Sequence, residues 1–317
     1  MKKIVLFVFL YFACINILNA NDSVFVSIVK NVSIKDTQET IQNAELLKED
    51  LSKQNFTQLV KSWKKVEALY FAGDMDEDYI DTPRYIDVFH NLKEDLNEQM
   101  QRVIDSKDEV NIALFKNSFK TINALEYVLL NDEVISKREK ELAIVILNSI
   151  ISKLEDINEV YENYVNNPNK SKKWENSLLM NTLIASTYRL KEWRIAEVAG
   201  ISSKYKNSPD NKRAEYNLSK NSLEAIKAIL DAHKKVMSKQ NFKNFYSVSN
   251  SFEITKQISD IQIYFKNIDN EIVKIKNDDL TKANELYKQV VNLHNAYYFS
   301  LLEQLSITSK IVDADGD

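Results

Sequence analysis

Apolar residues recur at spacings of three and four along most of the chain, which is typical of helices that bury one face. After an ambiguous leader over residues 21–34, the first such segment begins near Lys35, is interrupted near residues 54–55 and ends at Gly73. Its apolar positions are Phe56, Leu59, Val60, Trp63, Val66 and Tyr70. The pattern predicts a long helix with one break.

Helix start signals mark the elements that follow. Thr82 before Pro83 fits an N-cap with proline at the first helical position, and we expect that helix to reach about Val103. A third helix is expected from about residue 108 to residue 129. The pattern from Ser136 to Glu139 is a capping box, which predicts a long helix that stops before Pro168.

The second half of the chain repeats this style. Helices are expected at about residues 172–193, 219–237, 252–276 and 281–306, with a loop at 199–211. Neighbouring helices with short connectors favour up-down antiparallel packing. We therefore predict an all-α fold with two helical-bundle halves, residues 21–168 and residues 169–317.

Composition agrees with this fold and excludes several functions. Only three glycines and three prolines occur in 317 residues, so tight turns are scarce. A Gly-rich phosphate loop cannot form, because the glycines stand alone at positions 73, 200 and 316. The net charge is -4 and no basic stripe is present, so nucleic acid is not an expected partner.

The N-terminus has the three parts of a secretory signal. Lys2 and Lys3 precede the apolar run of residues 4–15, and Ala20 ends the segment, so residues 1–20 are predicted to be a cleaved signal peptide. An uncleaved anchor and a lipoprotein attached at Cys14 are the alternatives. Cleavage after Ala20 removes the one cysteine, which leaves oxygen and nitrogen atoms as the main metal donors.

Common catalytic motifs are absent from the sequence. HExxH and GxSxG do not occur, and His90, His233 and His294 are not at metal-ligand helical spacing. The acidic tail 313–317 lacks the glycine position and closing glutamate of an EF-hand loop. A standard zinc protease site and a serine hydrolase elbow are therefore excluded.

Polar residues gather in a segment from Gly73 to His90. Five acids, Asp74 among them, precede a helix whose first turns carry Arg84, Asp87 and His90 on one face. These side chains are candidates for a binding site. The alternative is a solvated acidic loop that favours the helix dipole.

Two further pairs place polar groups among apolar ones. Asn123 and Glu126 lie three residues apart in an otherwise apolar helix, where a carboxylate needs solvent or a partner. Trp63 and Glu67 form a similar pair four residues apart. Either pair is a polar stripe inside a bundle or part of an exposed face, and for Trp63 the alternative is simple core packing.

Taken in order, these segments resemble the imelysin family over most of the mature chain. The resemblance is carried by residues 63–74, 81–90, 123–130, 191–195, 219–222 and 315–317. It implies two helical-bundle halves with a site between them, in exported or envelope-attached bacterial proteins. Known members include an insulin-cleaving peptidase and a periplasmic component of iron uptake.

The family hallmark GxHxxE, proposed to bind metal, is altered in this chain. Its three positions correspond to Thr121, Asn123 and Glu126, so the glutamate is kept and the glycine and histidine are not. An amide oxygen is a weaker ligand for iron or zinc than imidazole is, although it suits a hard cation. The resemblance thus gives candidate metal ligands and further cleft residues: Glu126, Asn123, Glu67, Asp87 and His90, with Arg84, Asp74 and Trp63.

From the resemblance we expect a periplasmic protein that binds a metal, either iron or another divalent cation, for uptake or storage. Its partners would be the metal ion and a membrane permease or another envelope protein. Two alternatives remain open. One is a non-catalytic protein that binds a peptide or an envelope partner in the cleft, and the other is a metallopeptidase.

Overall fold

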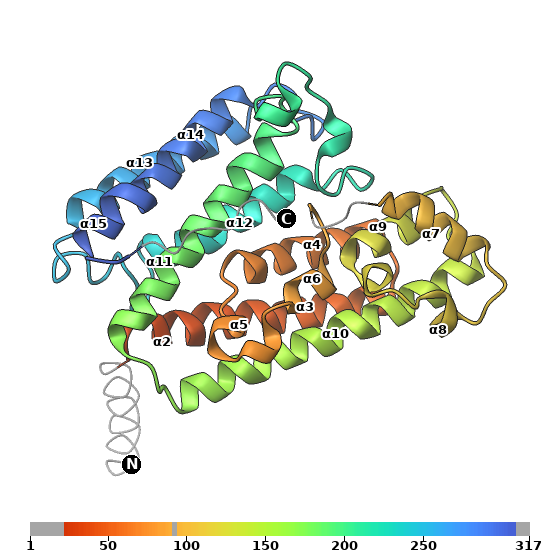
Figure 1. Cartoon of the computed structure of the whole chain (residues 1–317), viewed down its shortest axis with the longest axis horizontal. Coiled ribbons are helices and arrows are strands. Elements are labelled where there is room, and N and C mark those ends of the chain that lie inside the picture. Colours follow the sequence, from red (N-terminus) through yellow and green to blue (C-terminus); the bar gives the residue numbers. More distant parts are fainter. Residues whose placement is uncertain (1–21, 91–93, 309–317) are drawn as a thin grey trace, which may run out of the picture.

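Helices connected by short loops make up the part of the chain that the computed structural model describes, residues 22–90 and 94–308 (Figure 1). No strand occurs in these two ranges, and the all-α prediction is confirmed. The predicted signal peptide, Cys14 and the acidic tail lie outside the described residues.

The N-terminal helices are long and bury their apolar faces. Helix α2 continues without a break through a π-helical segment, η1, into α3, and α4 follows antiparallel to α3. The break lies at residues 50–52 and not at 54–55 as expected, because Ser52 caps the N–H of Asn55 and places Asn55 in the first turn of α4. The bounds are α2 (Val24–Ile28), η1 (Val29–Ser33), α3 (Ile34–Glu49) and α4 (Lys53–Ala68).

The helix expected from Thr82 to about Val103 is not continuous. It ends at Ile86, because the next residue, Asp87, is held in an extended conformation by tertiary hydrogen bonds from its side chain. The third expected helix is likewise divided into three short pieces. The elements of this region are α5 (Ala72–Met75), η2 (Glu77–Tyr79), α6 (Thr82–Ile86), α7 (Leu96–Asp105), α8 (Val110–Ala113), η3 (Asn117–Lys120) and α9 (Ile122–Leu130).

The capping box predicted at Ser136 is confirmed. Its hydroxyl accepts from the N–H of Glu139, whose carboxylate accepts from the N–H of Ser136, and α10 (Lys137–Asn166) follows. This helix packs along α3 and α9 and carries a continuous buried face. It is the longest element of the first half and runs along the lower edge of Figure 1.

The described part of the second half contains four long helices, two of which pass into π-helical segments, together with several three-residue helical turns. The expected helices at 172–193 and 281–306 correspond to α11 with η4 and to α14 with η7 and α15. The bounds are α11 (Lys172–Arg189), η4 (Leu190–Ala196), η5 (Ser203–Tyr205), η6 (Asn211–Arg213), α12 (Ser222–Met237), α13 (Thr255–Ile272), α14 (Asn284–Asn295), η7 (Ala296–Leu301) and α15 (Leu302–Gln304).

Helix α12 joins the two groups of helices. It packs against α4 on one side and α13 on the other, and α13 and α14 form the outer layer drawn in blue in Figure 1. Polar contacts reinforce the junction, since Lys235 of α12 pairs with the buried Asp36 of α3 at 2.5 Å. None of the described helices is both long and apolar enough to cross a membrane.

Candidate functional site

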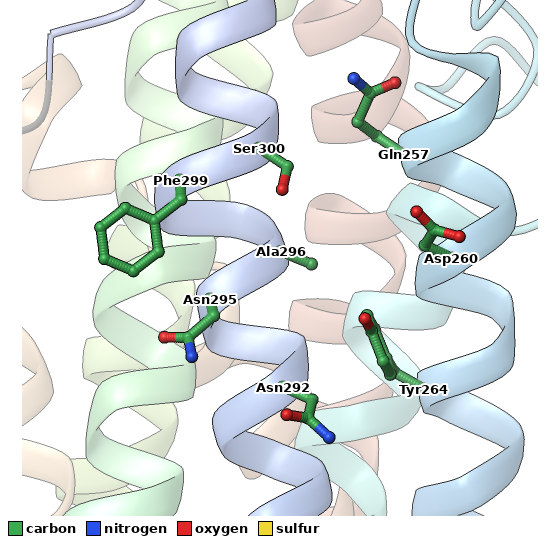
Figure 2. A pocket seen from close by; sticks show the side chains of 8 residues that line it. All are labelled: Gln257, Asp260, Tyr264, Asn292, Asn295, Ala296, Phe299 and Ser300. Atoms are coloured by element: carbon green, nitrogen blue, oxygen red, sulfur yellow. The ribbon is translucent and has the colours of Figure 1, made fainter.

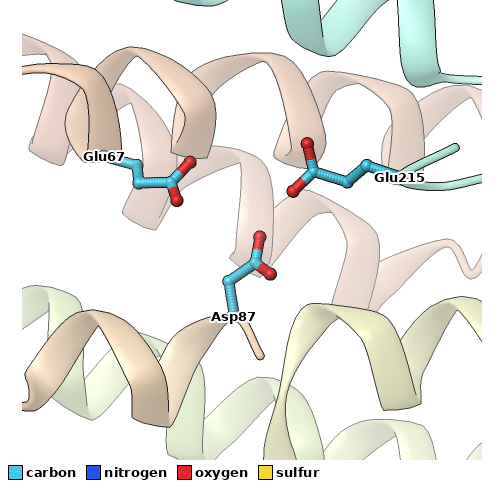
Figure 3. A group of neighbouring side chains, drawn as sticks. All are labelled: Glu67, Asp87 and Glu215. Carbon is cyan, nitrogen blue, oxygen red and sulfur yellow. The ribbon is translucent and has the colours of Figure 1, made fainter. Parts of the chain in front are cut away.

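Three carboxylates from distant parts of the sequence point toward one another at the junction (Figure 3). Glu67 comes from the last turn of α4, Asp87 follows α6, and Glu215 lies in the segment between η6 and α12. One oxygen of each lies within 4.8 Å of the others. Asp87 and Glu215 are buried, whereas the Glu67 side chain is 20% exposed. We call these three residues the carboxylate cluster.

The ammonium of Lys64 lies among the three carboxylates. Its Nζ is 2.8 Å from Glu67, 2.6 Å from Asp87 and 2.5 Å from Glu215, and its side chain is fully buried. Burial alone would lower the pKa of Lys64, but the three anions outweigh it and raise that pKa above its ordinary value. Lys64 is therefore a permanent positive charge inside the cluster.

Arg194 of η4 supplies a second buried cation. Its Nε donates to Glu215 at 2.7 Å and its Nη2 donates to Glu67 at 3.0 Å. Its guanidinium also lies over the ring of Phe89, 5.5 Å from the ring centre. Three carboxylates thus contact two cations, a nearly neutral arrangement in which each carboxylate has a charged partner.

Asp87 is the most densely hydrogen-bonded carboxylate. Its Oδ2 accepts from Trp63 Nε1 at 3.1 Å and from the Tyr216 hydroxyl at 2.6 Å, in addition to Lys64. Its Oδ1 accepts from the N–H of Phe89 at 2.9 Å. Burial would raise the pKa of Asp87, but Lys64 and these donors lower it well below the ordinary value. Asp87 therefore stays ionised.

Glu126 lies beside the carboxylate cluster without joining it. Its Oε1 accepts from the backbone N–H of Ser219 at 2.8 Å and from the Ser219 hydroxyl at 2.6 Å. Burial raises the pKa of Glu126 to about 7, assisted by the negative charges of Glu215 and Asp87 and opposed by Ser219. Its contacts fix the position of the segment that carries Glu215.

Asn123, one turn earlier on α9, has a similar role on the other side. Its Oδ1 accepts from the backbone N–H of Val88 at 2.7 Å. That bond holds the chain immediately after Asp87. Thr121 caps the same helix by accepting from the N–H of Ala124 at 3.3 Å.

The structure brings together only some of the residues predicted from the sequence. Glu67 and Asp87 belong to the carboxylate cluster, and Trp63 donates a hydrogen bond to Asp87. Asn123 and Glu126 lie beside the cluster. His90 instead stacks on Trp193, with ring centres 4.3 Å apart, and its Nε2 lies 2.9 Å from Glu197.

Two other predicted residues lie elsewhere. Arg84 is 65% exposed and pairs with Asp81 at 3.5 Å on the surface. Asp74 belongs to α5 and is not one of the clustered carboxylates. Burial raises the pKa of Tyr70, and the negative charge of Asp74 raises it further.

Sequence reasoning missed the residues that neutralise and enclose the cluster. These are Lys64, Arg194, Tyr216 and Ser219, and the third carboxylate of the cluster itself, Glu215, was also missed. One signal was present for Lys64, which lies four residues after Val60 on the apolar face of α4 and three residues before Glu67. A lysine at such a position needs a buried partner.

A metal ion implied by the family can be tested against these contacts. Carboxylate oxygens suit a hard cation. However, the central position is taken by the Lys64 ammonium, and the side-chain oxygen of Asn123 already accepts a backbone hydrogen bond. No imidazole belongs to the cluster. The residues present therefore do not fit a resident iron or zinc ion.

A separate polar groove lies between α13 and the α14–η7 segment (Figure 2). Gln257, Asp260 and Tyr264 approach it from α13, and Asn292 and Ser300 from the opposite side. Its cavity is about 190 Å³. None of the residues predicted from the sequence lines it, so the functional argument rests on the carboxylate cluster.

Comparison with known proteins agrees with this architecture. The family model described as Imelysin matches residues 32–297. The crystal structure of an imelysin-like protein from Psychrobacter arcticum 273-4 superposes with a TM-score of 0.76 at 13% identity, covering 90% of this chain and 95% of that one. The comparison with curated proteins gives no match. Because the family model spans most of the sequence, this chain belongs to the imelysin family.

Proposed function

We propose that the chain is an exported, non-catalytic binding protein of the bacterial envelope. It recognises a polypeptide partner through the rim of the carboxylate cluster, meaning η4 and the chain that follows Asp87. The observation that carries this proposal is the position of Lys64, whose ammonium pairs with all three carboxylates. The N-terminal sequence pattern supports export.

The protonation states of Lys64 and Asp87 argue against either group acting as a general acid or base. A general base or acid works best with a pKa near the operating pH. The pKa of Lys64 is raised and that of Asp87 is lowered, so neither group exchanges a proton near neutrality. Glu126 titrates near 7, but it is buried and its Oε1 is committed to Ser219.

The rim is formed by η4 and the chain that follows Asp87. Arg194 contacts both Glu67 and Phe89, the adjacent His90 stacks on Trp193, and Glu197 bonds to His90. Arg194 is buried, His90 is exposed and the other rim side chains are half-buried, and together they have the aromatic and charged composition of protein–protein contact surfaces. A polypeptide with both apolar and charged groups fits this rim better than a small apolar ligand does.

Site-specific photo-crosslinking in cells tests the proposal. A photoreactive phenylalanine analogue replaces Trp193 in the rim, and the same analogue replaces the exposed Tyr246, which is not a rim residue, as a control. We expect a discrete adduct from position 193 that weakens when Glu197→Lys reverses a rim charge. Equal adducts from both positions, or an adduct indifferent to the charge reversal, would overturn the proposal.

Metal binding for iron uptake is the second candidate, with iron as a transported ion and not a resident one, because three carboxylate oxygens lie within 4.8 Å of one another. It requires the Lys64 ammonium to leave these oxygens when the ion binds. Calorimetric titration with ferrous and ferric iron tests it on the wild type and on Glu67→Gln and Glu126→Ala. One-to-one binding that either substitution abolishes would favour this role over the first. Chelator-sensitive cleavage of an unfolded polypeptide would instead favour a metallopeptidase.

A further inference from the structure

The position of Lys64 has the geometry of a bound cation. Its Nζ lies 2.5–2.8 Å from one oxygen of each carboxylate in the cluster. Calcium–oxygen distances in proteins are about 2.3–2.6 Å, close to these values. The ammonium thus stands where a divalent cation would bind the same three oxygens.

The charges of the directly paired groups lead to the same conclusion. Three carboxylates face Lys64 and Arg194, which leaves one net negative charge among them. Without the Lys64 charge, two net negative charges remain in a buried site. Buried charges that lose a partner are strongly destabilising, so the vacated site would favour a divalent cation.

We infer that Lys64 is a built-in cation that occupies a latent metal site, and that removing its charge converts the carboxylate cluster into a site for a hard divalent cation. This inference shares with the proposed function only the statement that the wild-type cluster is metal-free. It concerns the cluster itself and not the partner that the rim recognises.

The chemistry of the donors selects the kind of ion. All three are carboxylate oxygens, which suit Ca²⁺ and Mn²⁺ rather than zinc or copper. The hydrogen bonds from Trp63 and Tyr216 to Asp87 do not involve Lys64 and keep that carboxylate oriented. Methionine lacks the ammonium and is one heavy atom shorter than lysine, so Lys64→Met removes the charge, and its flexible side chain has to turn aside to admit the ion.

The test uses Mn²⁺ alone as the probe, with binding followed by electron paramagnetic resonance and by thermal unfolding. We expect Lys64→Met to bind one Mn²⁺ at least about tenfold more tightly than the wild type and to gain thermal stability as Mn²⁺ rises. Lys65→Met is the matched control, because Lys65 is the next residue of α4 and pairs with Glu39, outside the carboxylate cluster, at 3.0 Å. It should bind Mn²⁺ no better than the wild type.

A second variant, Lys64→Met with Glu215→Gln, removes one ligand charge and should lose the gained affinity. If Lys64→Met is unfolded alone, Mn²⁺ should restore its helical circular dichroism, and failure to do so overturns the inference. Failure of Lys64→Met to bind Mn²⁺ overturns the inference and leaves the proposed function standing. Tight Mn²⁺ binding by the wild type at this cluster overturns both.

Discussion

Replacing Glu126 by glutamine removes a buried ionisable group with little change of shape. The pKa of Glu126 is raised from 4.5 to about 7 by burial and by the nearby negative charges of Glu215 and Asp87. Between those two pH values the folded state keeps a proton that the unfolded state has lost, so stability falls as pH rises. Each pH unit changes the free energy of unfolding by about 1.4 kcal/mol, and the full penalty is on the order of 3 kcal/mol.

This penalty is absent below pH 4.5, the pKa of Glu126 in the unfolded state, and complete above about pH 7, its pKa in the folded state. Glutamine cannot titrate, and its carbonyl can still accept from the N–H of Ser219. We therefore expect the stability of Glu126→Gln relative to the wild type to increase by on the order of 3 kcal/mol from about pH 4.5 to about pH 8.

Urea unfolding followed by far-ultraviolet circular dichroism across this pH range measures the difference. Glu139→Gln is the control of opposite sign, since hydrogen bonds from Asn131 and Ser136 lower the pKa of Glu139 against the effect of its burial. That variant should be less stable than the wild type at neutral pH, with a difference that shrinks as pH falls through the folded pKa of Glu139. Parallel pH profiles for the wild type and Glu126→Gln would refute the reasoning.

Three further substitutions test single contacts by thermal or urea unfolding. Trp63→Phe removes the indole N–H that bonds to Asp87 at 3.1 Å and should lower the free energy of unfolding by about 2 kcal/mol or more. An unchanged unfolding midpoint would show that this bond does not stabilise the fold. Ser136→Ala removes the N-cap of α10 and should cost about 1 kcal/mol, which a neighbouring exposed change such as Lys137→Ala should not. Gly200→Ala should destabilise by more than about 1 kcal/mol, because φ is +67° there and a Cβ would lie 2.7 Å from the Pro209 nitrogen.

The helical architecture could be predicted from periodicity and capping, because both depend on residues that are close together in the sequence. The capping box at Ser136 needs only residues within one turn, and it forms as predicted. The same reasoning failed after Thr82, where a helix was expected to reach Val103. There the side chain of Asp87 bonds to Trp63 and Tyr216, and these contacts end α6 at Ile86. Contacts between residues so far apart in the sequence cannot be predicted from the spacing of apolar residues along one segment.

The candidate site was predictable only in part for a similar reason. Trp63 and Glu67 are four residues apart on one helix, so their spacing predicts that they share a face. Asp87 was a candidate because it lies in a segment rich in polar residues. Glu215 and Arg194 lie more than a hundred residues away from them, in segments whose local sequence does not mark them as buried. Their partners are set by how α4 and α12 pack, which spacing along one helix does not specify.

Asn123 and Glu126, which the sequence resemblance matches to the family motif, have a clear structural use in this chain. Asn123 accepts from the N–H of Val88 and so holds the segment bearing Asp87, while Glu126 accepts from Ser219 and holds the segment bearing Glu215. Both acids reach Lys64 from segments without regular helix, which need such anchors to keep a fixed geometry. The residues at the motif positions therefore support a cluster whose cation is already part of the protein.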